Sequence, residues 1–232
     1  MNWSSGKDAA MALHTLQQSP HLRCVSLLTS ISQEFQRVSM HGLRREVLEA
    51  QAKAIDLPLT LMELPPNASM EIYDQVFQQT LKTFRGRQCL TAAYGDIFLE
   101  DLRIYREKQC QPLGMELLFP LWKRNTTDLI HSFVDLGFEA IVVCLNENKL
   151  PPEFLGRTID LDFIRDLPKD VDPCGENGEF HTFCYKGPIF NAPVEFQLGE
   201  KIRRSYPDPQ EETKEIGYWF LDILLPQDST EV

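Results

Sequence analysis

The chain has 232 residues, of which 43% are hydrophobic and 25% are charged, so it can bury a core as one large domain or two small ones. Its 23 basic and 34 acidic residues give a net charge of -11, which argues against a general binder of nucleic acids or of anionic membranes. A polyanionic ligand must therefore meet a local positive site.

Six cysteines are scattered without a C-x-x-C pair, and several lie in apolar runs, so reduced and mostly buried thiols are expected. No signal peptide precedes residue 1, and no apolar stretch approaches the roughly 18 residues that a membrane span needs. These features predict a cytoplasmic protein.

The first chemical motif is a phosphate-binding loop at the N-terminus. Ser4, Ser5 and Gly6 are small enough for backbone amides to approach an anion, and a helix-like run follows at once, with its free amides and positive dipole end. Lys7 adds a mobile cation, and Asp8 can cap the helix or hold a phosphate-bound Mg²⁺. A short Ser/Gly turn that caps a helix is the alternative interpretation.

The spacing of this loop differs from Walker A, which requires a glycine five residues before Gly6 and a hydroxyl after Lys7. It is close to the S-G-G-x-D-S loop of ATP pyrophosphatases, which bind the β and γ phosphates and release them as pyrophosphate. Only three residues precede the loop, too few for an ordinary strand. Either that strand is very short, or it is missing from this chain.

Apolar β-rich runs alternate with amphipathic stretches over the next part of the chain. Strands are predicted at residues 22–29, 58–62, 89–93, 116–120 and 139–145, and helices at 41–55, 70–84, 99–108 and 126–136. The alternation predicts an α/β fold with a mostly parallel sheet and helices on both faces. After about residue 148 the chain changes to short Pro/Gly-punctuated segments, with a β-like run at 188–196, which predicts a smaller α+β domain. The predicted organisation is therefore a nucleotide-binding domain at 1–122, a substrate-side domain at 123–226 and a tail at 227–232.

Gly95 and Asp96 follow the strand predicted at 89–93. Ligands of parallel sheets lie at the carboxyl ends of strands, so this turn is expected to line one crevice with the N-terminal loop. Glycine would permit a close approach, and the aspartate would be available to Mg²⁺ or ribose. A plain strand-ending turn is the alternative.

A second cluster lies at residues 172–183, where Glu176, Glu179, His181 and Thr182 are bracketed by glycines. If 179–183 is a strand, Glu179 and His181 share one face and Thr182 faces oppositely. A carboxylate beside a histidine can act as a general base or hold a substrate amine. A Gly-rich turn whose carboxylates cap neighbouring amides is the alternative, and a zinc site fits these residues poorly.

Three isolated features have simpler interpretations. His41 is expected to cap a helix or lie on the surface. Trp122 is expected to pack in the core or between domains rather than stack on adenine. Arg203 and Arg204 form a dense basic pair that would either be solvated or meet an anionic substrate.

Together the motifs resemble the diphthine–ammonia ligase family of N-type ATP pyrophosphatases. The matching segments are residues 3–8, then 95–97, 113–114 and 119–122, and finally 174–182. The resemblance implies a HUP-type nucleotide-binding domain, a small C-terminal domain, and cleavage of ATP to AMP and pyrophosphate with Mg²⁺. In the reaction that names the family, the carboxylate of diphthine on elongation factor 2 is activated as an acyl-adenylate, which ammonia attacks to form the amide.

The resemblance also implies roles for residues of this chain. Nucleotide binding would fall to the loop and the second turn: Ser4, Ser5, Gly6, Lys7, Asp8, Ala9, Gly95 and Asp96. Asp8 and Asp96 would lie near Mg²⁺, while Glu176, Glu179, His181 and Thr182 would face the substrate, with His181 or Glu179 deprotonating the incoming ammonium. Ser5 and Ala9 depart from the family pattern, which has glycine and serine there.

The substrate is less closely defined. Residues 98–107 and the Phe-Pro-Leu-Trp-Lys run look more like the bacterial branch of the family, and bacteria do not make diphthamide. A bacterial paralogue acting on a small carboxylic acid or amide, for example in corrinoid salvage, is one alternative, and a module that senses ATP or AMP without turnover is another. The expected partners are ATP, a carboxylate-bearing substrate and ammonia, without nucleic acid or membrane, and a homo-oligomer stays open.

Overall fold

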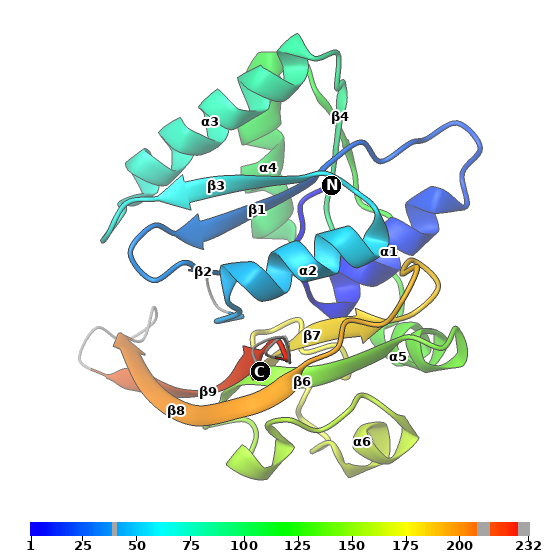
Figure 1. The fold of residues 1–232 in the computed structure, drawn as a ribbon, viewed down its shortest axis with the longest axis vertical. Helices are drawn as coiled ribbons and strands as arrows, with labels where there is room; N and C mark the ends of the chain where they lie inside the picture. Colours follow the sequence, from blue (N-terminus) through cyan, green and yellow to red (C-terminus); the bar gives the residue numbers. More distant parts are fainter. Residues whose placement is uncertain (39–40, 208–213, 227–232) are drawn as a thin grey trace, which may run out of the picture.

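The structure is a computed structural model that describes residues 1–38, 41–207 and 214–226 (Figure 1). Its helices are α1 (Lys7–Gln17), α2 (Arg45–Ile55), α3 (Met70–Gly86), α4 (Glu100–Cys110), α5 (Thr126–Asp135) and α6 (Leu161–Asp166), with short 3₁₀ turns at Gln111–Leu113 and Pro152–Phe154. Its strands are β1 (Leu27–Ser32), β2 (Arg37–Val38), β3 (Leu59–Leu64), β4 (Thr91–Ala93), β5 (Glu116–Leu118), β6 (Glu139–Asn146), β7 (Phe180–Lys186), β8 (Gln197–Pro207) and β9 (Glu215–Leu224).

Residues 1–3 join the parallel strands of the N-terminal half into one sheet. β1 pairs in parallel with β3, β4 pairs in parallel with β5, and β2 is added to β1 antiparallel. Asn2 forms a parallel bridge with Leu28, and its amide donates to the carbonyl of Ala93 at 2.8 Å. The sequence left open whether a strand precedes the phosphate loop. The structure has a very short one, paired on both sides.

The two faces of this sheet are covered by different helices. Leu27 and Ile31 on β1 belong to the same apolar core as α1 and α2, whereas Leu28 on the same strand packs in a separate core with Phe77 of α3 and Cys110 of α4. Successive residues of a strand point to opposite faces, so the sheet is buried on both sides. The predicted α/β class is confirmed.

The second half of the chain forms an antiparallel sheet in the order β7-β6-β9-β8. In Figure 1, α1 and α2 lie between the two sheets, α3 and α4 lie beyond the parallel sheet, and α5 and α6 accompany the antiparallel one. One apolar core extends from Leu13 of α1 to Phe183 of β7, so it crosses from one half to the other. The antiparallel sheet is therefore part of the packing that supports α1.

Several predicted elements differ from the structure. Residues 188–196 contain no strand, α2 begins at Arg45 instead of residue 41, and β1 begins at Leu27 instead of residue 22. The long strands β8 and β9 were not predicted, and β8 is exposed along its length, without the buried alternation that marks a strand in sequence. The predicted tail at 227–232 lies outside the described residues.

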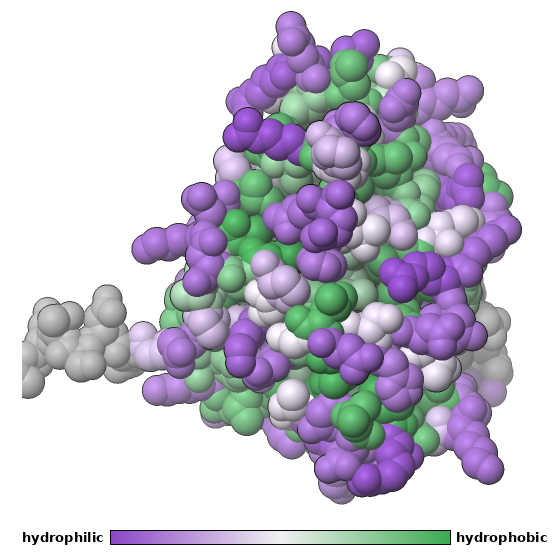
Figure 2. Space-filling view, turned by 90° about the vertical axis from the view of Figure 1, so that its right-hand side faces the viewer, coloured by the Kyte–Doolittle hydropathy of each residue, from purple (hydrophilic) through white to green (hydrophobic). Residues whose placement is uncertain are grey.

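The surface gives no sign of a membrane span among the residues that the structure describes, because none of their helices is both long and apolar enough to cross a bilayer. On the face shown in Figure 2, hydrophobic residues gather in small patches that hydrophilic ones surround. All six cysteines are free, as predicted, and four of them are buried.

Gln51 on α2 ties the N-terminal segment to the antiparallel sheet. Its side chain is fully buried, and its Oε1 accepts from the Trp3 indole at 2.7 Å. Its Nε2 donates to the carbonyl of Ser5 at 3.0 Å and to that of Cys184 on β7 at 2.6 Å. One side chain thus holds the short strand, the loop after it and β7 together.

We expect Gln51→Leu to lower the free energy of unfolding by about 2–5 kcal/mol, because it leaves buried donors and acceptors without partners. Urea unfolding monitored by circular dichroism measures the change. Gln79→Leu, an identical substitution at an exposed position of α3, is the matched control and should change stability by about 0.5 kcal/mol or less. Equal effects of the two substitutions would contradict a clamping role for Gln51.

Candidate functional site

The phosphate loop lies against the open edge of β7. The amide of Cys184 donates to the carbonyl of Ser5 at 3.0 Å, and the amide of Lys7 donates to the Thr182 hydroxyl at 3.0 Å. β7 is an outer strand of its sheet, so its outward backbone groups are free to bind the loop. Thr182, predicted to face the substrate, contacts the loop and sets its position.

The loop has a constrained backbone at the position where the family has glycine. Ser5 adopts φ 72°, in the left-handed region that side chains disfavour. Gly6 follows as the N-cap of α1 and has no side chain to cap the helix, while the Thr182 hydroxyl accepts from the first helical amide, that of Lys7. A Cβ on Gly6 would lie 2.9 Å from the His41 ring and 3.2 Å from the Thr182 carbonyl, so only glycine fits there.

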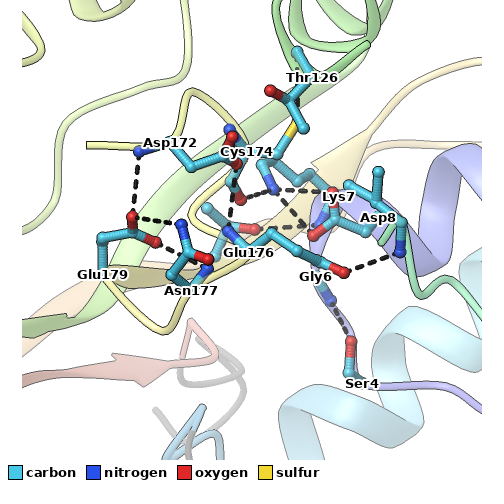
Figure 3. A network of polar contacts seen from close by, with 12 residues as sticks. Ser4, Gly6, Lys7, Asp8, Thr126, Asp172, Cys174, Glu176, Asn177 and Glu179 are labelled. Atoms are coloured by element: carbon cyan, nitrogen blue, oxygen red, sulfur yellow. Dashed lines mark hydrogen bonds and ion pairs between the residues drawn. The ribbon is translucent and has the colours of Figure 1, made fainter. Parts of the chain in front are cut away.

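Lys7 is buried, with 2% of its surface exposed, and its ammonium group binds both carboxylate oxygens of Asp8 at 2.8 Å (Figure 3). It also donates to the carbonyl of Cys174, in the loop before β7. Burial by itself would lower the pKa of Lys7, but its neighbours, Asp8 first and then Cys174 and Glu176, together outweigh burial, and the pKa lies above its ordinary value. The loop therefore carries a permanent cation, which Asp8 neutralises in this state.

Glu176 joins the second predicted cluster to the Gly95–Asp96 turn. Its Oε1 accepts from the amide of Ile97 at 2.8 Å. Burial is the main cause that raises the pKa of Glu176 to about 7; nearby Asp8 adds to the shift, while the amides of Ile97 and Phe98 and the charge of Lys7 oppose it. This carboxyl group can exchange a proton near neutral pH, as a general acid or base must.

Glu179 has a different environment. Its carboxylate accepts from the amide of Asp172 at 3.0 Å and from the amide and side chain of Asn177 at 2.9 and 3.0 Å (Figure 3). The side chain is 1% exposed. These contacts match the alternative in which a carboxylate caps the amides of its own turn, so Glu179 shapes the segment that presents Glu176 and Cys174.

His181 packs against His41, with ring centroids 4.8 Å apart. Burial is the main cause that lowers the pKa of His181 to about 3 and that of His41 to about 4. Both imidazoles are neutral at physiological pH and weak as bases. His41 was expected to be a helix cap or a surface residue, and that prediction is wrong: α2 begins at Arg45, and the Nδ1 of His41 lies 3.1 Å from the Thr182 carbonyl.

The Gly95–Asp96 turn reaches the beginning of α1, as predicted. A Cβ on Gly95 would lie 3.0 Å from backbone atoms of Asp8 and Ala9, so glycine permits this close packing. The Asp96 carboxylate is held by Arg106, at 3.2 Å for the longer of two bonds, and Arg106 stacks on the Tyr94 ring at 4.3 Å. A role of Asp96 toward Mg²⁺ or ribose stays a prediction.

The metal prediction also stays open for Asp8. Within the described part of the chain, no group of three or more His, Cys, Asp or Glu side chains is arranged to hold a metal ion. Asp8 binds Lys7 and Asp96 binds Arg106. Mg²⁺ typically binds through one or two carboxylates with substrate phosphates supplying further ligands, so these residues fit an ion that arrives with a nucleotide.

Trp122 is half-buried, and its contacts come from its own half of the chain, so packing in the core or between domains stays a prediction. Its ring lies 5.6 Å from that of Phe119, and the guanidinium group of Arg103 covers it at 4.9 Å.

Sequence reasoning missed Gln51 as well as His41. Gln51 had a detectable signal, since it is a polar residue on the apolar face of α2 beside Val47, Leu48 and Ala52.

Comparison with known proteins decides the family. Residues 1–117 match the diphthamide synthase N-terminal domain, and residues 125–208 match the diphthamide synthase C-terminal domain. The chain belongs to the diphthamide synthase family. The diphthine–ammonia ligases of Homo sapiens and Rattus norvegicus are 30% and 31% identical to it over 101 residues, which cover 41% of this chain and 38% of each relative. The diphthine–ammonia ligase of Danio rerio is 25% identical over 128 residues, 53% of this chain and 49% of the relative. The chain thus spans less than half the length of these relatives.

The backbone strain at Ser5 predicts an unusual order of stabilities. Ser5→Gly should be more stable than Ser5→Ala by about 0.5–1 kcal/mol, because removing Cβ relieves a left-handed conformation that costs roughly 1–2 kcal/mol. At most positions glycine is the less stable of the two. Thermal unfolding of both variants measures the difference, and a more stable alanine variant would contradict the left-handed assignment.

The environment of Glu176 predicts a pH dependence. Its pKa is about 7 in the folded protein and ordinarily 4.5, so the folded state binds the proton more tightly. The resulting stability is present at low pH and is lost as the pH rises toward 7. We expect the stability of Glu176→Gln relative to the unsubstituted protein to increase between pH 5 and pH 7, by up to roughly 3 kcal/mol, and then to level off.

Denaturant unfolding at several pH values measures this difference. Glu195→Gln, at an exposed position, is the matched control and should show no such trend. A constant difference for Glu176→Gln would mean that its carboxyl group is ionised across this range.

Proposed function

We propose that this protein is an ATP-dependent ligase that activates a substrate carboxylate, releases AMP and pyrophosphate, and forms an amide with ammonia. The observation that carries the proposal is the position of Lys7, a buried cation at the start of a helix whose N-cap is glycine, with Glu176 beside it. Family membership supports the same chemistry. In the N-terminal sheet, residues 1–3 lie between β1 and β4, and the phosphate loop follows them directly. This order supports the HUP-type arrangement.

The pyrophosphate part of ATP would bind the N-terminal amides of α1 together with Ser4, Ser5, Gly6, Lys7 and Ala9. Lys7 would exchange its partner Asp8 for phosphate oxygens. The Asp8 carboxylate would then be free to bind Mg²⁺, which supplies positive charge where the leaving group becomes more negative. Gly95 and Asp96 would lie beside the nucleotide, with Asp96 acting toward Mg²⁺ once it is released from Arg106.

Glu176 is better suited than His181 to deprotonate the incoming ammonium. A group with a pKa of about 7 is partly ionised at neutral pH and still basic, whereas an imidazole with a pKa of about 3 accepts a proton only weakly. His181 and His41 would act as neutral hydrogen-bonding walls of the site. Glu179 and Thr182 would hold the surrounding loops in place.

The acceptor acid is open at this point. The relatives' name refers to diphthine, and for this chain a carboxylate on a modified protein or on a small molecule fits the proposal equally. Assembly into a homo-oligomer and a cytoplasmic location stay predictions. The named relatives are ligases, and no observation favours a nucleotide sensor.

Nucleotide binding and product analysis test the proposal in sequence. Lys7→Ala should weaken binding of α,β-methylene-ATP with Mg²⁺ by about tenfold to a hundredfold, the loss that corresponds to one charge-assisted hydrogen bond. Lys53→Ala, at an exposed position of α2, is the matched control and should bind normally. Isothermal titration calorimetry measures both variants, and unchanged affinity in Lys7→Ala would place the nucleotide elsewhere.

With ATP, ammonium and diphthine-bearing elongation factor 2, or with a panel of small acids, turnover should give AMP and pyrophosphate in equal amounts. Chromatography of the nucleotides identifies the products. Glu176→Gln should keep nucleotide affinity and lose about a hundredfold or more in rate. ADP and phosphate as the sole products would overturn the ligase proposal.

A further inference from the structure

A cavity of about 670 Å³ lies between the β1–β2 turn, the loop after β3, and strands β8 and β9. Its lining includes large apolar side chains that stay accessible: Phe35, Ile202 and Tyr206 are 58%, 41% and 38% exposed. Cavities of this volume are typical of sites for small organic molecules. None of the residues assigned to the phosphate loop, the Gly95–Asp96 turn or the cluster at 172–183 lines it, whereas Arg204, for which an anionic substrate was one alternative, does.

Arg204 gives this cavity a cation that none of the described carboxylates neutralises. Its guanidinium group lies 6.0 Å from the rings of both Phe35 and Phe220. No carboxylate of the residues described forms an ion pair with it, whereas its neighbour Arg203 binds Glu147 at 2.6 Å. Neighbouring residues of a strand face opposite sides, so only Arg204 of this pair lines the cavity.

The other charges of the cavity are already balanced or lie outside its centre. Asp222 binds Arg37 at 2.8 Å and Arg44 at 2.7 Å. Burial opposes ionisation of Asp222, but the two guanidinium groups lower its pKa to about 2, so it stays charged and paired. Glu34 is exposed. Arg204 is therefore the group in this lining that is available to an anion.

The cavity shares one sheet face with the proposed active site. Across the antiparallel sheet, Ile202 pairs with Phe220, Phe220 with Cys144, and Cys144 with His181. Paired residues point to the same face, and neighbouring strands lie about 4.8 Å apart, so this row spans roughly 14 Å from His181 to Ile202. Gly42, next to His41, contacts Phe220, where a Cβ would lie 3.0 Å from the ring.

We propose that this cavity binds the far end of the acceptor, a small organic acid with an apolar or aromatic body and a second anionic group that Arg204 holds. The inference rests on the proposed ligase function, because the reacting carboxylate would lie at Lys7 and Glu176. The acid would be elongated, with about 10–15 Å between its two ends, as the strand spacing requires. An adenine ring would fill the cavity less well, since it is neutral and leaves Arg204 without a partner.

The anionic dye anilinonaphthalene sulfonate and its uncharged analogue N-phenylnaphthylamine are suitable probes of the cavity. We expect the unsubstituted protein to bind both dyes, with enhanced fluorescence. Arg204→Gln should weaken binding of the sulfonate by about tenfold or more and leave the uncharged dye nearly unaffected, because only the sulfonate forms a charge-assisted contact. Arg203→Gln, one residue away on the opposite face, is the matched control and should bind both dyes normally.

Each other outcome would overturn the proposal. Failure of the unsubstituted protein to bind the sulfonate, or equal binding by Arg204→Gln, would mean that the cavity has no anion site. Displacement of the dye by α,β-methylene-ATP would assign the cavity to the nucleotide. Loss of dye binding at high protein concentration, with dimers in sedimentation, would make this face a contact between copies. The ligase proposal fails separately, through its reaction products, so the two failures are distinguishable.

Discussion

The contact between the phosphate loop and the edge of β7 is the constraint on which the rest of the structure depends. A loop whose amides point toward an anion cannot also satisfy all of its backbone groups internally. Here the Ser5 carbonyl and the Lys7 amide find partners on β7. The loop is thus fixed by a strand from the other half of the chain, and the antiparallel sheet helps to set the geometry of the loop.

This constraint explains the order of layers. α1 must have its N-terminus at the carboxyl end of the central parallel segment and must also lie beside β7. Packing α1 and α2 between the two sheets satisfies both requirements, and the continuous core from Leu13 to Phe183 follows from it. Gln51 lies where the short N-terminal strand, the phosphate loop and β7 meet. Its polar side chain is buried there because it forms hydrogen bonds to all three. The same packing places Cys174 and Glu176 against Lys7 and the Gly95 turn.

The sequence predicted those parts of the site that local chemistry determines. Lys7 and Gly6 were recognisable because a lysine follows a run of small residues directly before a helix, and the Gly95 turn followed from the strand before it. Glu179 and Asp96 could not be assigned, since a carboxylate that caps a turn and one that acts on substrate have the same local pattern. His41 was missed because its partner His181 is 140 residues away in the sequence. β8 was missed because it is exposed along its length, so it lacks the alternation of buried and exposed residues and resembles a solvated segment.

The contacts that complete the loop have unusually long sequence separations: Lys7 to Thr182 spans 175 residues and Lys7 to Cys174 spans 167. During synthesis the loop is made well before its partners on β7. Contacts of such high sequence separation form late, because the chain between them must first be ordered. The parallel sheet can begin to fold while the chain is still growing, but the loop can adopt its described contacts only after β7 has been made. A truncated chain that ends before residue 180 would therefore retain the loop's residues without its geometry.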